Sequence, residues 1–126
     1  MKKVMLKLLS AAALAGMMAT PVQADEAAMA AAGAEVFKRC QACHSIDSSK
    51  NAFGPSLIGV VGREAASLPR FAYSDALKQS GITWTEDNLR LWVADNTKLV
   101  PGTRMRHVSI SDAAEQDYLI AYLKTL

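Results

Sequence analysis

The sequence predicts an all-α fold of about four short helices joined by long loops. Apolar side chains recur at helical spacing in the second half of the chain, and no stretch shows the sustained apolar and polar alternation of a strand. Between residues 45 and 70, glycine and proline recur at intervals too short for a long regular element. No internal repeat is visible. A loop of this length needs something to wrap around.

The first two helices are expected on either side of that loop. Residues 27–39 are rich in strong helix formers and lead directly into the two cysteines of the chain. Gly33 costs helix propensity there, which suggests a close packing contact. Residues 73–81 are expected to form a short helix, with Ser74 as its N-cap and Gly81 as its stop.

Two further helices are expected toward the C-terminus. The hydroxyl of Thr85 can cap a third helix, whose apolar stripe is Leu89, Trp92 and Val93. A fourth helix begins near Ser111 or Asp112, and Glu115 completes a capping box if Asp112 is the cap. Apolar residues recur at helical spacing along it: Tyr118, Leu119, Tyr122, Leu123 and Leu126.

Residues 1–24 have the pattern of a secretory signal peptide. Three lysines precede the apolar run 8–19, and small residues at 22–24 suit a cleavage site. The run has 12 residues, short of the roughly 20 that span a bilayer as a helix. We expect cleavage, an exported domain of residues 25–126 and a periplasmic location, without stable membrane insertion.

The charge balance gives no case for nucleic-acid binding. The signal contains three of the 14 Lys and Arg residues, which leaves 11 against the 12 Asp and Glu residues. Local positive charge is a separate matter, because basic residues could gather on one face as a docking surface or be scattered and solvated. The candidates are Lys38, Arg39, Lys98, Arg104 and Arg106.

The segment from Cys40 to His44 carries the strongest chemical signal. Two thiols at the spacing of Cys40 and Cys43 can add across both vinyl groups of one haem, with His44 then placed as the proximal iron ligand. A structural zinc site needs four protein ligands, and outside this segment only His107 and carboxylates are left to complete one. A dithiol redox pair would follow a strand in a βαβ pattern, which is not visible. Covalent haem attachment is the leading interpretation.

Met105 is the candidate for the other face of the iron. Four of the six methionines lie in the predicted signal, which leaves Met29 and Met105. Pro101 and Gly102 favour an ordered turn just before Met105. Methionine often fills gaps in a core, but the neighbours of Met105 are polar. His107 is a rival ligand that we expect to point elsewhere, being two residues away.

These residues resemble class I c-type cytochromes over nearly the whole of residues 25–126. The matching segments, in the order of the family, are 33–37, 40–44, 54–57, 62–63, 71–76, 81–84, 101–105 and 119–124. The resemblance implies a cytochrome c fold wrapped around one covalent haem c, with the iron held by His44 and Met105.

The resemblance also implies roles for residues away from the iron ligands. The loop carbonyl at Pro55 would accept the ring N–H of His44. Leu119 and Tyr122 would pack across the first helix near Gly33 and Phe37. Donors to a buried haem propionate would be Arg63, Tyr73 and Trp84, with the Thr103 hydroxyl beside them.

Three positions depart from the family pattern. Trp92 stands where many relatives have a tyrosine that bonds to the methionine sulfur, and its indole N–H can donate but not accept. Leu77 stands where mitochondrial forms have an asparagine, and His107 takes the place of a phenylalanine. These positions affect the potential and the iron–sulfur bond rather than the fold.

The expected function is that of a soluble, monomeric single-electron carrier and not an enzyme. A closed coordination sphere leaves no site for a substrate, and the thioether raises the potential. Partners would dock briefly at the exposed haem edge; the resemblance suggests a cytochrome bc complex, a terminal oxidase, a photosynthetic reaction centre or a periplasmic dehydrogenase. The alternatives are a haem enzyme or small-ligand binder with a labile distal site, and a carrier tethered by an uncleaved signal.

Overall fold

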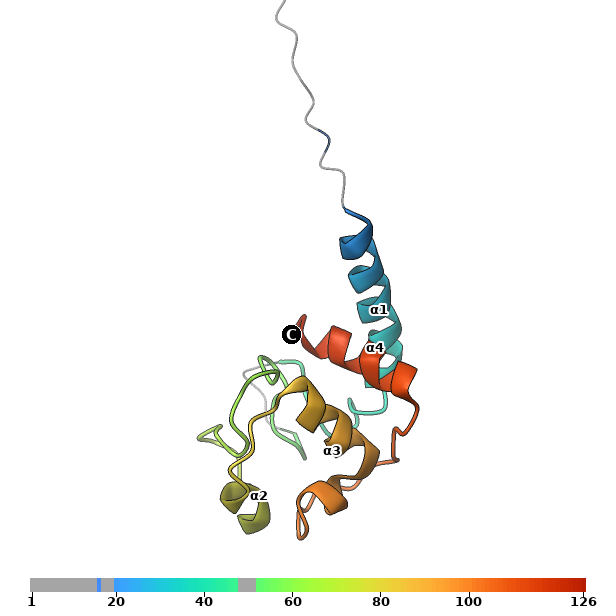
Figure 1. Cartoon of the computed structure of the whole chain (residues 1–126). Coiled ribbons are helices and arrows are strands. Elements are labelled where there is room, and N and C mark those ends of the chain that lie inside the picture. Colours follow the sequence, from blue (N-terminus) through green and yellow to red (C-terminus); the bar gives the residue numbers. More distant parts are fainter. Residues whose placement is uncertain (1–15, 17–19, 48–51) are drawn as a thin grey trace, which may run out of the picture.

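A computed structural model describes residue 16, residues 20–47 and residues 52–126 of the chain. The helices are α1 (Pro21–Phe37), α2 (Asp75–Gln79), α3 (Glu86–Leu99) and α4 (Ala113–Leu123), and long loops join them (Figure 1). Within the described part, pairing of extended chain is limited to one isolated bridge between Glu64 and Thr83. The all-α prediction is confirmed. Most of the predicted signal lies outside the described residues.

Helix α1 begins and ends earlier than the sequence pattern predicted. Pro21 occupies its first turn, where a missing N–H costs nothing, and the backbone N–H of Thr20 donates to Oε1 of Gln23 at 3.2 Å. After Phe37 the chain continues in tight turns, in which the N–H of Cys40 donates to the Phe37 carbonyl at 2.8 Å. These turns bring the cysteine motif directly against the end of the helix.

Helices α1 and α4 pack across one another, as Figure 1 shows. A Cβ added at Gly33 would lie 1.8 Å from the carbonyl oxygen of Tyr118 and 2.7 Å from the Cβ of Tyr122. One turn along α1, the rings of Phe37 and Tyr122 have centroids 5.0 Å apart. The expected packing of the last helix on Gly33 and Phe37 is confirmed, and it explains the glycine.

The N-caps of the other three helices are the residues that the sequence predicted. Each side chain accepts a hydrogen bond from a backbone N–H three residues on, at Ser74, Thr85 and Asp112. The second half of the capping box predicted for α4, a bond from the Asp112 N–H to the Glu115 side chain, is replaced by an ion pair. The Glu115 carboxylate pairs with the Arg39 guanidinium at 2.8 and 3.0 Å instead of returning to the cap. That pair joins the turn before the cysteines to α4.

Helix α3 is interrupted at Asp95, whose φ of −159° and ψ of 90° are not helical. The Asp95 carboxylate oxygen accepts from the backbone N–H of Lys98 at 3.0 Å and from the Thr97 hydroxyl at 2.8 Å. It therefore caps a short final turn, which continues into the loop that carries Met105.

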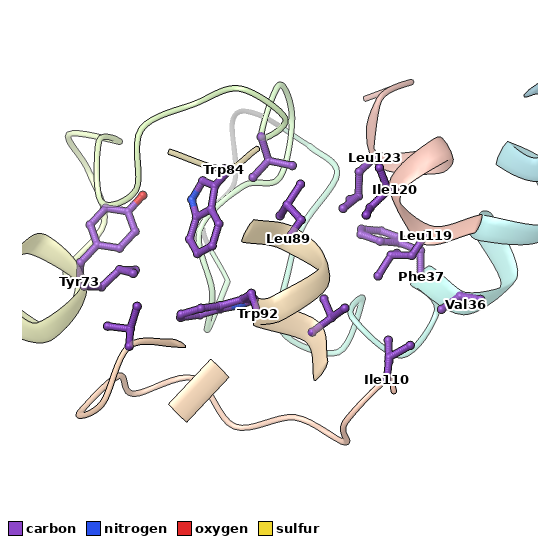
Figure 2. Packing of buried hydrophobic residues seen from close by; sticks show 14 residues of the cluster. Val36, Phe37, Tyr73, Trp84, Leu89, Trp92, Ile110, Leu119, Ile120 and Leu123 are labelled. Atoms are coloured by element: carbon purple, nitrogen blue, oxygen red, sulfur yellow. The ribbon is translucent and has the colours of Figure 1, made fainter. Parts of the chain in front are cut away.

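The buried core has two parts that α3 connects. Figure 2 shows Phe37, Leu119, Ile120 and Leu123 together where α1 meets α4, whereas Trp84 and Trp92 lie toward α2. The two indoles meet edge to face, with centroids 4.9 Å apart and planes at 72°. No helix in the described ranges is long and apolar enough to cross a membrane.

Candidate haem site

The two cysteines and His44 lie together in the turns that follow α1. The backbone N–H of His44 donates to the Cys40 carbonyl at 2.9 Å, which fixes the backbone of His44 relative to that of Cys40. Cys40 is half-buried and Cys43 is exposed, and neither forms a disulfide. His44 is buried. Both thiols are therefore free to react, next to an imidazole that is shielded from water.

One nitrogen of the His44 ring is committed to the neighbouring loop. Nδ1 lies 2.7 Å from the backbone oxygen of Pro55, and because a carbonyl only accepts, Nδ1 carries the proton. Burial lowers the pKa of His44, although the bond to Pro55 opposes that shift. Burial likewise raises the pKa of the Cys40 thiol. The lowered pKa favours the neutral imidazole, with Nε2 as its basic nitrogen, which is the form that ligates a metal.

Gly54 lets the loop approach the His44 ring. A Cβ at this position would lie between 2.5 and 2.9 Å from three atoms of the imidazole, closer than real Cβ contacts allow. The N–H of Gly54 also donates to the Cys43 carbonyl at 2.7 Å. The segment 54–55 therefore holds His44 by a hydrogen bond and by direct contact.

Met105 is held by two side chains of α3. Nε1–H of Trp92 donates to the Met105 sulfur at 3.2 Å, and Nδ2 of Asn96 donates to the Met105 backbone carbonyl at 2.8 Å. The preceding turn contains Gly102 with φ of 88°, and the N–H of Thr103 donates to the Val100 carbonyl at 3.1 Å. Thioether sulfur has two lone pairs, so one remains after the bond to Trp92.

His107 is directed toward its own loop. Its Nδ1 lies 2.9 Å from the backbone oxygen of Val108, the next residue, and therefore donates to it. The ring is half-buried. As at His44, this bond leaves Nε2 available, so the expectation that the rival ligand points elsewhere stays a prediction.

Three of the predicted propionate donors lie close together. The backbone N–H of Trp84 donates to the Arg63 carbonyl at 2.8 Å, and Tyr73 is near enough to Arg63 to interact electrostatically. The Arg63 guanidinium donates to the carbonyls of Ser56 and Ile58, each at 2.9 Å. Burial lowers the pKa of Arg63, so a nearby anion would offset the cost of its desolvation.

Thr103 differs from these three residues. Its side chain is buried in the turn before Met105. No hydrogen bond among the described residues joins it to Arg63, Tyr73 or Trp84. It belongs to the Met105 loop in this structure.

The donor set fits covalent haem. It consists of two free thiols beside a neutral imidazole, and a thioether that is fixed on a separate loop. Cys40 and Met105 pack against the same buried cluster. A cavity of about 650 Å³ lies among α1, α3 and α4, away from this donor set, with polar residues such as Glu26, Glu86 and Asp117 in its lining. Cavity size alone would thus have pointed away from the cysteine motif.

Comparisons with known proteins agree with this assignment. The model of the family described as Cytochrome c matches residues 30–126. Cytochrome c2 of Blastochloris viridis is 47% identical over 96 residues, which are 75% of this chain and 76% of that protein. Cytochrome c-550 of Nitrobacter winogradskyi is 44% identical over 93 residues, covering 73% of this chain and 85% of the relative.

A solved structure is also similar. Cytochrome cH from Methylobacterium extorquens superimposes with a TM-score of 0.72 at 50% identity, covering 77% of this chain and 98% of the other. The helical fold and the cysteine motif define a class I c-type cytochrome. The chain belongs to the cytochrome c family.

Membership of this family establishes the general activity. The chain is an electron carrier and not an enzyme, and it carries haem c bound covalently through its cysteine pair. Its partners are other redox proteins. The expected fold, cofactor and class of activity are thereby confirmed.

Sequence reasoning missed two residues that the structure brings to the site. Asn96 gave no signal, because regular helical spacing does not anticipate the break in α3 at Asp95 that precedes it. Gly54 was noted as part of a loop and of the matching segment 54–57, and nothing in its spacing shows that it touches the His44 ring. Both contacts depend on tertiary placement.

Proposed function

We propose that the chain is a soluble periplasmic single-electron carrier whose iron is ligated by His44 and Met105. The observation that carries this proposal is the pair of bonds that fixes the candidate ligand atoms. The bond from Nδ1 of His44 to Pro55 leaves Nε2 available, and the bond from Trp92 leaves one lone pair on the Met105 sulfur.

The residues of the haem site then have separate roles in electron transfer. Haem iron supplies a one-electron couple between its ferrous and ferric states, and a His/Met ligand pair raises its potential. His44 and Met105 hold their positions through bonds to the protein, so little rearrangement accompanies a change of charge. Arg63, Tyr73 and Trp84 provide a partly buried donor group for a propionate, with Thr103 on the adjoining loop.

The surface charges favour docking beside the Met105 loop. Lys98, Arg104 and Arg106 are exposed there. Lys38 and Arg39 are exposed too, but they pair with Glu35 and Glu115, at 2.6 and 2.8 Å. Their charges are partly compensated, so we assign the main steering role to the first three residues. Membrane redox complexes of the cytochrome bc, oxidase or reaction-centre type, or a periplasmic dehydrogenase, are the proposed partners.

Absorption and electron paramagnetic resonance spectra of the ferric protein test whether His44 and Met105 ligate the iron. A far-red band of the iron–thioether bond is expected in the wild type, together with a low-spin iron. A wild type that lacks this band would refute ligation by Met105 and would favour the alternative of a labile or open distal site.

Export and cleavage are tested separately. We propose that residues 1–24 are removed, and we expect the amino terminus of the periplasmic protein to be Asp25. A start at Met1 would instead indicate a carrier tethered by an uncleaved signal.

A further inference from the structure

Asn96 contacts both ends of the loop that carries Met105. Its side-chain Nδ2 donates to the backbone carbonyl of Met105 at 2.8 Å. Its backbone carbonyl accepts from the Val100 N–H at 2.9 Å. The loop of residues 100–105 is therefore hydrogen-bonded at both of its ends to one residue of α3. We propose that Asn96 is a positioning residue that keeps the Met105 thioether on the iron by closing this loop, an inference that rests on the proposed ligation by Met105.

The break in α3 places Asn96 for this role. Asp95 leaves the helical conformation, and its carboxylate caps the last turn through Thr97 and Lys98. Asn96 therefore sits at the first position of a restarted turn, one helical turn beyond Trp92. Trp92 holds the tip of the Met105 side chain, and Asn96 holds the backbone from which that side chain extends.

Burial makes the Asn96 contact hard to replace with water. Asn96 is 6% exposed and Val100 is 4% exposed, so both loop-closing bonds begin at buried groups. A buried polar group that loses its partner keeps the cost of its desolvation. In contrast, Arg104 and Arg106 on either side of Met105 are exposed and contribute little apolar packing. Hydrogen bonds thus provide much of the constraint on this part of the loop.

Loss of the Asn96 amide should favour states in which Met105 has left the iron. Met105 must move with its backbone, and that movement breaks the bond to Asn96. A hydrogen bond of this kind contributes enough to change an equilibrium about fivefold. An added ligand that competes with Met105 for the iron should bind about fivefold more tightly once the bond is gone.

The test is a titration of the ferric holoprotein with imidazole, followed by the loss of the far-red thioether band. The variants are Asn96→Leu, which keeps the size of the side chain, and Asn96→Ala, which avoids overpacking if the first variant folds poorly. Asn88→Ala is the matched control. Asn88 also lies on α3, is half-buried, and donates from Nδ2 to a backbone carbonyl, that of Thr83, at 2.7 Å.

The expected result is an approximately fivefold higher imidazole affinity in both Asn96 variants and an unchanged affinity in Asn88→Ala. The pH at which the thioether band disappears should also fall in the Asn96 variants alone. Wild-type affinity in the Asn96 variants, or an equal increase in the control, would overturn the positioning role while leaving ligation by Met105 intact. A wild-type protein without the band would refute the ligation itself, and the inference with it.

Discussion

His44 and Met105 are held in contrasting ways. His44 follows the second cysteine directly, and a hydrogen bond and a close contact from residues 54–55 fix its ring. Met105 is half-buried, lies between exposed arginines, and depends on two side chains of the interrupted helix α3. One candidate ligand is set by a short contiguous motif and the other by a tertiary arrangement.

This contrast indicates which properties each side of the site controls. His44 lies beside the cysteines and the end of α1, whose packing on α4 forms one part of the core. Changes on that side should therefore affect folding. The Met105 loop is joined to α3 by individual hydrogen bonds, so changes there should alter ligand exchange and potential while the fold remains.

The largest effect is expected from the double variant Cys40→Ser, Cys43→Ser. Covalent haem should be lost, and most of the folded structure with it, because a domain of this size depends on the cofactor for part of its interior. Haem staining of the denatured protein and far-UV circular dichroism measure the two losses. Recovery of a helical, cooperatively unfolding apoprotein would show that haem attachment at Cys40 and Cys43 does not control folding.

A smaller, local loss of stability is expected from Gly54→Ala. The new Cβ would overlap the His44 ring, with a closest approach of 2.5 Å, and should cost about 3 kcal/mol of unfolding free energy. Chemical denaturation of the ferric holoprotein measures that cost. The matched control is Gly59→Ala, where φ is 66° but nothing lies within 4 Å, so backbone strain alone should cost about 1 kcal/mol. Equal costs would mean that the contact with His44 adds nothing.

The cysteine and histidine motif and the helix caps were predictable from the sequence, because each depends on residues that are close together along the chain. The spacing of the two cysteines and His44 is fixed within five residues, and Ser74 and Thr85 cap helices that begin at the next position. The start of α1 at Pro21 was missed, because a pattern of helix formers does not reveal the bond between Thr20 and Gln23.

The Met105 side was predictable only in part. The polar surroundings of Met105 and the resemblance to cytochromes drew attention to it, and Trp92 was recognised as a potential donor. The role of Asn96 was not accessible, since it requires the non-helical conformation of Asp95 and the return of the loop to α3. Such contacts join residues that helical spacing alone would not place together.

On the distal side, Met105→Ala should leave the protein folded but open the iron to added ligands. The potential should fall by on the order of 100 mV, because the thioether that favours ferrous iron is removed. Redox titration and imidazole binding measure these changes. Met29→Ala is the control, since it removes the other methionine of residues 25–126 from α1 and should change neither property. An unchanged spectrum in Met105→Ala would indicate that another residue ligates the iron.

The smallest effect is expected from Trp92→Phe, which removes the N–H that donates to the Met105 sulfur while keeping an aromatic ring against Trp84. The donated hydrogen bond draws electron density from the sulfur and so favours ferrous iron. Its loss should lower the potential by about 20 mV, the equivalent of a weak hydrogen bond for a one-electron couple. Leu91→Ala on the exposed face of α3 is the control and should leave the potential unchanged. A wild-type potential in Trp92→Phe would mean that α3 fixes the position of the Met105 thioether without changing the potential of the iron. The contacts of α3 with the Met105 loop would then serve only to keep the ligand in place.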